Sequence, residues 1–302
     1  MDRADFTDRI TRSVDTLPGQ LGAAARYVME NPGDVALLSM REQARRAGVQ
    51  PWTMTRLAKR LGLDGYEEVR RLHGKALKEQ ALGFSGRAGI QVQRHRQAGG
   101  RALAGEIAAA TAEHVARFGK AETLDAMTEA AAAMARARRI YCFGLRSARP
   151  VADHLAYLLS FLGEKPVRMD TDGGGFDALR FATAEDVFFV ATVAPYTRAS
   201  VDAARHARDM GLTVIALTDS AASPVAVSAR HAILVSTESP SFFHAVAPSF
   251  AAVEILAALV AGEGGDAALD AIARAERQLA ELKVHIFEGL ARTRRKERKE
   301  KR

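Results

Sequence analysis

The sequence predicts an α/β protein in two parts: an N-terminal all-α helix-turn-helix domain, followed by a doubly wound, five-stranded parallel α/β domain. Residues 17–78 carry apolar side chains at helical spacing, interrupted by Gly and Pro. Residues 139–235 carry short apolar runs with helical segments between them, as in a parallel sheet that is buried on both faces. The chain of 302 residues is long enough for both parts, and 48% of it is hydrophobic, so packed cores are expected.

The helical part is organised around residues 40–72, where a short helix, a turn, a second helix and another turn follow one another. Ser39 and Glu42 stand three residues apart, as in a capping box, which predicts the start of the first helix. Gly48 permits the left-handed backbone of the turn, and Pro51 suits the first turn of the second helix. The apolar residues expected to point inward are Ala44, Val49, Met54, Leu57, Ala58 and Leu61. This pattern indicates a helix-turn-helix, whose second helix enters the major groove of DNA.

Shorter helices are expected before this motif. Residues 17–29 have helical periodicity and end at the Asn-Pro-Gly of 31–33, and residues 35–38 form a short helical segment. Residues 1–16 are polar, so they predict at most a weak helix.

Positive charge is concentrated in two blocks of the sequence. The chain has a net charge of +7, yet residues 41–78 hold ten Lys/Arg against four Asp/Glu, and residues 292–302 hold eight against two. The remainder is therefore mildly acidic. A basic block on a helix-turn-helix favours binding to the phosphate backbone of DNA, although a solvated helix face is the alternative. The basic tail is expected to stay solvated, with contact to DNA as its alternative.

The outward positions of the second helix are the candidate DNA contacts. Residues at the start of such a helix meet base edges, and later residues meet phosphates. The candidates are Gln50, Trp52, Thr53, Thr55, Arg56, Lys59 and Arg60. Trp52 keeps two interpretations, a contact with DNA or a contact within the protein.

The domains are predicted at residues 1–80, for the DNA-binding part, and 101–290, for the α/β part. Residues 81–100 lose clean periodicity and gain glycine, which predicts a linker, and a basic tail occupies 291–302. The Ala-rich start of the second part, up to residue 137, predicts two helices broken near Gly119.

Five apolar runs predict the strands of the sheet, at residues 140–143, 166–169, 186–192, 213–217 and 232–235. Helices are expected at residues 151–162, 198–210, 246–261 and 266–290. In a 2-1-3-4-5 strand order, ligands bind beyond the carboxyl ends of the first and third strands, where the order reverses.

Two loops are expected to meet in that crevice, one after each of these strands. Both lead into helices and carry hydroxyls, arginines and backbone N–H groups, which together suit an anion, most naturally a phosphate. The candidate ligand-binding residues are Gly144, Arg146, Ser147, Thr192, Tyr196, Thr197 and Arg198.

The helical part resembles the N-terminal domain of RpiR/MurR-type bacterial transcriptional regulators. The matching stretches are 27–40 (YVMENPGDVALLSM), 49–62 (VQPWTMTRLAKRLG) and 63–72 (LDGYEEVRRL). Gln50, Trp52 and Leu63 depart from the residues usual there, namely Ser, a small residue and Phe. These departures leave the fold prediction intact and leave the operator sequence open.

Residues 139–260 resemble a SIS (sugar isomerase) domain, the usual second half of this family, which has a flavodoxin-like sheet. The matching stretches are 143–152 (FGLRSARPVA) and 211–226 (GLTVIALTDSAASPVA). The resemblance implies a cytoplasmic regulator that binds operator DNA as a homodimer or homotetramer and senses a sugar phosphate or another anionic sugar. It implies no cofactor.

The phosphate loop departs from the family pattern, which is generally Ser-x-Ser-Gly-x-Ser/Thr. Here it reads TVAPYT, with Ala194 for a hydroxyl residue and Pro195, which lacks an N–H, for glycine. Tyr196 and Arg198 are expected to replace the missing donors, or else the ligand has no phosphate at that position.

An isomerase would need a general base near the sugar, and the candidates are Glu238, His244 and Glu254. The fused DNA-binding part instead predicts a sensor without a catalytic residue. No His spacing typical of a metal site and no G-x-S-x-G motif is present in the sequence. Two alternatives stay open: a sugar-phosphate isomerase, and a regulator whose SIS domain only oligomerises.

The single cysteine, Cys142, excludes a disulfide within the chain and fits a reducing compartment. The N-terminal residues lack the apolar core of a signal peptide, and no stretch approaches the roughly 18 uninterrupted apolar residues of a membrane span. A cytoplasmic protein without membrane contact is therefore expected.

Overall fold

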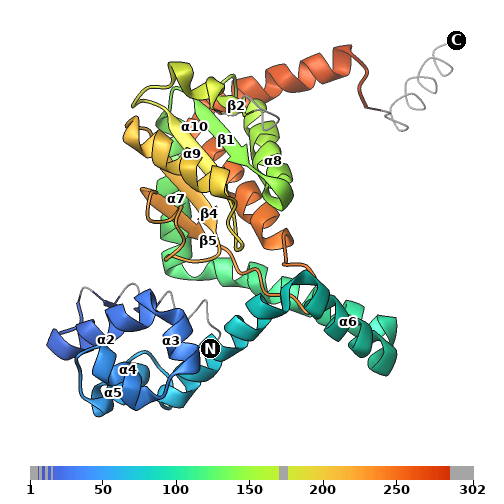
Figure 1. Ribbon diagram of the computed structural model, residues 1–302. Helices are drawn as coiled ribbons and strands as arrows, with labels where there is room; N and C mark the ends of the chain where they lie inside the picture. The colour runs from blue at the N-terminus through green and yellow to red at the C-terminus, as the bar shows by residue number, and fades with distance from the viewer. Residues whose placement is uncertain (1–5, 7–8, 11–12, 15, 170–175, 286–302) are drawn as a thin grey trace, which may run out of the picture.

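The computed structural model describes residues 6, 9–10, 13–14, 16–169 and 176–285, with the backbone alone for 75–81. Figure 1 shows a helical lobe and an α/β lobe joined by one long helix, α6. The basic tail and the end predicted for the last helix lie outside the described residues.

From residue 16 onward, the described part of the helical lobe contains α2 (Gly19–Glu30), α3 (Pro32–Leu37), α4 (Met40–Arg46) and α5 (Pro51–Arg60) before α6. All six apolar residues that the sequence predicts to point inward are buried. The polar N-terminal segment contributes more than the sequence predicts, because Phe6 and Ile10 are both 1% exposed in the same core.

The turn between α4 and α5 forms as the sequence predicts. The N–H of Glu42 donates to Ser39 Oγ at 3.3 Å, and Gly48 has a φ of +67°. Buried Gln43 adds a polar link that the sequence did not reveal: its amide donates to the carbonyls of Val35 and Leu38, and its oxygen accepts from the hydroxyl of Tyr66. One amide therefore joins α3, α4 and the start of α6.

Helix α6 (Tyr66–Ala116) corrects the prediction of a linker at residues 81–100, because that segment is helical. Only Gly83 (φ +56°) and Gly99 (φ +81°) leave the helical conformation. The residues between these two glycines are rich in Ala, Gln and Arg, which favour helix and outweigh the other glycines of the segment. The short 3₁₀ turn η1 (Arg117–Gly119) and α7 (Ala121–Arg136) follow, so the predicted break near Gly119 is confirmed.

The five strands form one parallel sheet. They are β1 (Ile140–Gly144), β2 (Pro166–Arg168), β3 (Val187–Ala191), β4 (Thr213–Thr218) and β5 (His231–Leu234), in the spatial order β2-β1-β3-β4-β5. The predicted order is therefore confirmed, and the expected strand ends agree within one or two residues.

Helices cover both faces of the sheet (Figure 1). Alternate strand residues such as Cys142, Phe189 and Ile215 pack against α7, α8 (Arg149–Ser160) and α10 (Ala247–Glu281). The intervening residues, such as Phe188 and Val214, pack against α9 (Arg198–Asp209) and the 3₁₀ segment η3 (Asp177–Phe181). Burial on both faces explains why the strands are apolar throughout.

Helix α10 is the one described helix that is long and apolar enough to cross a membrane. Its residues Ala252, Val253 and Leu256 are fully buried against the sheet and α8. The apolar composition is therefore that of a core helix.

Gly144 is a position where a side chain does not fit. A Cβ built there would lie 2.4 Å from the carbonyl oxygen of Ala148, which belongs to the backbone. We expect Gly144→Ala to lower the free energy of unfolding by about 1–3 kcal/mol, because the loop after β1 must shift. Thermal unfolding followed by circular dichroism measures the effect.

Gly105→Ala is the matched control, since Gly105 lies in α6 with open space around its Cα. It should stabilise the protein by about 0.5–1 kcal/mol. Equal melting temperatures for Gly144→Ala and the wild type would contradict the close approach of the loop.

Candidate functional site

The loop after β1 turns sharply at the carboxyl edge of the sheet. Gly144 allows the backbone of Ala148 to approach the strand end, and the 3₁₀ turn η2 (Arg146–Ala148) leads into α8. Ser147 is half-buried in this turn, whereas Arg146 is exposed and has a φ of +54°. Of the two, only Ser147 lines the adjoining hollow.

The loop after β3 lies beside it. Thr192 is buried and its N–H donates to the carbonyl of Leu217 at 3.0 Å. The N–H of Ala194 donates to Asp219 Oδ1 at 3.3 Å, so a carboxylate already occupies one donor of this loop. Thr197 precedes the first residue of α9, Arg198, which is exposed.

These two loops meet a third segment, residues 236–246 between β5 and α10, which we call the closing loop. His244 Nε2 of the closing loop shares a hydrogen bond of 2.9 Å with Ser147 Oγ. The hollow between them has a volume of only about 10 Å³. It is lined by Ser147, Ala148, Val151, Ala191, Thr192, Val193, Leu217, His244, Ala245, Val246 and Ser249.

The predicted ligand-binding residues are therefore only partly brought together. Ser147 and Thr192 line the hollow, and Gly144 supports the turn that holds Ser147. The others, Arg146, Tyr196, Thr197 and Arg198, lie outside its lining. The hollow is too small for a sugar, so a ligand would have to displace the closing loop.

Helix α6 packs against the closing loop from the other side. The rings of Phe84 and Phe243 stack with centroids 5.2 Å apart, and Phe243 stacks on His244 at 4.2 Å. Gln91 Oε1 accepts a hydrogen bond of 2.8 Å from the N–H of Phe242. These contacts could not be predicted from the sequence, because the residues of α6 and of the closing loop that make them stand more than 150 positions apart in the chain.

Four buried polar atoms around the closing loop have no hydrogen-bond partner: Arg87 Nε, His114 Nδ1, Ser236 Oγ and His244 Nδ1. Burial and the charge of Arg87 lower the pKa of His244 below its ordinary value, against the opposing effect of Asp219. Burial and Arg87 therefore favour the neutral form of the imidazole. Arg87 and Ser236 were not predicted, and no local motif marks them.

Of the three candidate bases, only His244 lies in the hollow. Glu254 is 62% exposed, and its Oε1 lies 3.4 Å from His154 Nε2. Glu238 is exposed, and its backbone carbonyl is within hydrogen-bond distance of His114 Nε2, at 2.8 Å.

Among the described residues, no group of three or more His, Cys, Asp or Glu side chains could hold a metal ion.

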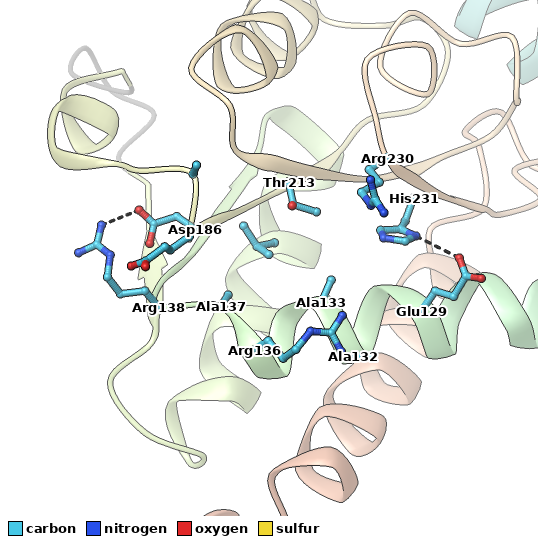
Figure 2. A pocket seen from close by; sticks show the side chains of 13 residues that line it. Glu129, Ala132, Ala133, Arg136, Ala137, Arg138, Asp186, Thr213, Arg230 and His231 are labelled. Carbon is cyan, nitrogen blue, oxygen red and sulfur yellow. Dashed lines mark hydrogen bonds and ion pairs between the residues drawn. The ribbon is translucent and has the colours of Figure 1, made fainter.

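A wider hollow of about 850 Å³ lies at the opposite, amino edge of the sheet (Figure 2). Its charged groups pair largely with one another: Arg138 with Asp186 at 2.6 Å, and His231 with Glu129 at 3.4 Å. Asp186 also accepts from the backbone N–H groups of Arg139 and Thr183. We take this hollow as structural, because the helix N-termini that attract anions in such a fold point to the carboxyl edge.

The outer face of α5 is the second candidate site. Gln50, Arg56, Lys59 and Arg60 are exposed, and Trp52 is 58% exposed, with the guanidinium of Arg56 5.8 Å from the centre of its ring. The interpretation of Trp52 as a core residue is therefore wrong.

Two threonines of α5 differ from the other candidates. Thr53 was expected to face outward, but it is 1% exposed and its hydroxyl donates to Gln20 Oε1 of α2 at 3.3 Å. Its position one turn before Leu57 brings it onto the inner face of the helix, a consequence of the 3.6-residue period. Thr55 is half-buried, next to Met40 Sδ at 3.5 Å.

Residues 133–261 match the SIS domain family. An HTH-type transcriptional regulator of Caldanaerobacter subterraneus is 26% identical over 225 residues, which are 72% of this chain and 75% of the relative. The sugar isomerase domain of the RpiR transcription factor from Sphaerobacter thermophilus is 25% identical, with a TM-score of 0.53, over 58% of this chain and 98% of that domain.

These likenesses support an RpiR-family regulator. The NanR protein of Vibrio vulnificus, solved with ManNAc-6P, extends the likeness of fold to 92% of this chain and 99% of NanR. Its identity is 19% and the TM-score 0.50. The helical lobe and the SIS domain therefore occur in this order in a solved structure as well.

The environment of His244 gives a direct test of the site geometry. We expect His244 to titrate below pH 6.5, since burial and Arg87 both disfavour its charged form. Arg87→Gln should raise its pKa and Asp219→Asn should lower it further. NMR titration of the imidazole C–H signals measures both shifts.

Arg94→Gln is the control, because Arg94 lies on the same helix, is about half exposed and is paired with Glu106. It should leave the titration unchanged. A pKa of His244 at or above 6.5 in the wild type would show that the closing loop is solvated.

Proposed function

We propose that this protein is a cytoplasmic, homo-oligomeric transcription factor of the RpiR family that binds operator DNA through α5 and senses a sugar phosphate or related anionic sugar. The observation that carries the proposal is the path from one site to the other. Helix α6 begins in the helical lobe and packs against the loop that carries His244 to Ser147. A DNA-binding surface and a ligand crevice thus share one structural element.

The outer face of α5 supports the first half of the proposal. Exposed arginines and a lysine provide the cations that a phosphate backbone attracts, and Trp52 provides a flat apolar surface beside Arg56. Two copies are expected to bind together, since a palindromic operator presents two half-sites. The residues proposed to meet DNA are Gln50, Trp52, Thr55, Arg56, Lys59 and Arg60.

The carboxyl edge of the sheet supports the second half. Ser147 and Thr192 provide hydroxyls beside the starts of α8 and α9, where helix dipoles favour an anion. NanR, which has a similar fold, is solved with ManNAc-6P, a phosphorylated sugar. Arg146, Tyr196, Thr197 and Arg198 lie at the edge of the crevice and are proposed to reach the ligand once the closing loop has moved.

An isomerase is the second candidate. It is favoured by one observation, since the hydrogen bond to Ser147 holds a neutral imidazole, that of His244, where a sugar would bind. The carboxylates of Glu238 and Glu254, however, are exposed and do not line the hollow. A regulator whose SIS domain only oligomerises would bind DNA without responding to any sugar. Assays of sugar-phosphate turnover and of the DNA response separate these three functions.

We expect Arg56→Ala and Lys59→Ala each to weaken operator binding by about 5- to 100-fold and to reduce its salt dependence, because each removes a phosphate contact. Fluorescence anisotropy on DNA from upstream of the gene, repeated at several salt concentrations, measures both quantities. Arg101→Ala, an exposed position of α6, is the control. Unchanged affinity in both α5 variants would move the DNA interface away from this helix.

We expect Ser147→Ala to weaken the response of operator binding to the effector by about tenfold, while the affinity for DNA without effector stays unchanged. The physical reason is the loss of one hydroxyl donor from the anion site. The same anisotropy assay, titrated with a panel of sugar phosphates, provides the measurement. Loss of DNA binding together with the response would indicate misfolding of the variant rather than loss of the site.

A further inference from the structure

Several buried polar atoms near the contact between α6 and the closing loop have no hydrogen-bond partner, which is unusual for a contact that serves stability alone. Arg87 Nε, Ser236 Oγ and His244 Nδ1 are each buried without a hydrogen-bond partner. Burying such a group unpaired costs free energy, and a charged donor such as Arg87 costs more than a neutral one. Arg87 belongs to α6, and Ser236 and His244 lie near the two ends of the closing loop.

Arg87 is half-buried, and its side chain packs on an aromatic ring. Its guanidinium lies 5.1 Å from the centre of the Phe84 ring, and Phe84 stacks on Phe243. This row of side chains ends at His244, because Phe243 stacks on that imidazole in turn. The guanidinium at the start of this row has N–H donors that suit an anionic oxygen.

We propose that Arg87 of α6 is an effector-binding residue, which donates from Nε to an anionic oxygen of the effector while Ser236 and His244 bond its hydroxyl groups. The proposal rests on the proposed function, because Arg87 and Ser236 lie outside the lining of the closed hollow and would reach the ligand only once the closing loop has moved. An anionic, polyhydroxylated ligand matches the three atoms, because it offers one charged acceptor and several groups that both donate and accept.

The position of Arg87 gives the site a direct route to the DNA-binding lobe. The crevice is closed, at about 10 Å³, so a ligand enters only when the closing loop moves. That loop is attached to α6 by the stacking of Phe84 on Phe243 and by the hydrogen bond from Phe242 to Gln91. A ligand that draws Arg87 inward thus favours one position of α6 over another, which is the differential contact that coupling requires.

The test is calorimetry of the full-length protein with inorganic phosphate, glucose 6-phosphate, glucosamine 6-phosphate and ManNAc-6P, and with the unphosphorylated sugars. For each phosphorylated compound that the wild type binds, Arg87→Gln should raise the dissociation constant at least tenfold. Arg87→Lys, which keeps the charge but not the planar donor, should lose less. Arg94→Gln, on the same helix but exposed, should match the wild type.

Three outcomes separate this inference from the proposed function. If Ser147→Ala weakens binding but Arg87→Gln stays within twofold of the wild type, the role of Arg87 is overturned and the proposed function stands. If a neutral sugar binds as well as its phosphate and Arg87→Gln does not affect either, an anion-binding role for Arg87 is also overturned. If the folded wild type binds no compound of the panel, both fall.

A second measurement covers the case in which Arg87→Gln does not fold. The Nε–H resonance of Arg87 in the ¹⁵N spectrum of the wild type is assigned through Arg87→Lys. It should shift on saturation with a binding sugar phosphate, whereas that of Arg94 should not. An unmoved Arg87 resonance at saturation would overturn the proposal.

Discussion

The hydrogen bond between Ser147 and His244 closes the carboxyl edge of the sheet, and the organisation of the site depends on it. It joins the loop after β1 to the loop before α10, almost one hundred residues later. On its far side His244 leads through stacked rings to α6. The same contact that seals the crevice thus ties the SIS domain to the helix that carries the helical lobe.

The sequence allowed the fold to be predicted because its local signals agreed with each other. The capping box at Ser39, the left-handed Gly48 and the alternation of apolar runs with helical segments each specify a local structure that tertiary packing then keeps. The error at residues 81–100 arose because lost periodicity together with several glycines was taken as the end of a helix. Only the backbone shows that Gly83 and Gly99 leave the helix while Gly86 and Gly89 do not.

The residues of the candidate site could be predicted from the sequence less completely than the fold. Ser147 and Thr192 follow strands and precede helices, so the topology rule located them. Arg87 and Ser236 have no such marker, because one lies in a helix that appeared to be a linker and the other follows an edge strand. Thr53 shows the complementary limit: one step of 100° around a helix separates an outward from an inward side chain, and spacing alone did not assign it.

The two glycine breaks of α6 bear on how far a local change can travel. An unbroken helix of 51 residues would behave as a single stiff rod, and any rotation at one end would reach the other. Breaks at Gly83 and Gly99 divide it into three shorter rods with two joints. Gly83 lies four residues before Arg87, so the segment of α6 that leads to the helical lobe ends just outside the crevice. A movement of the closing loop that shifts α6 beyond Gly83 would therefore reach the helical lobe only through this joint.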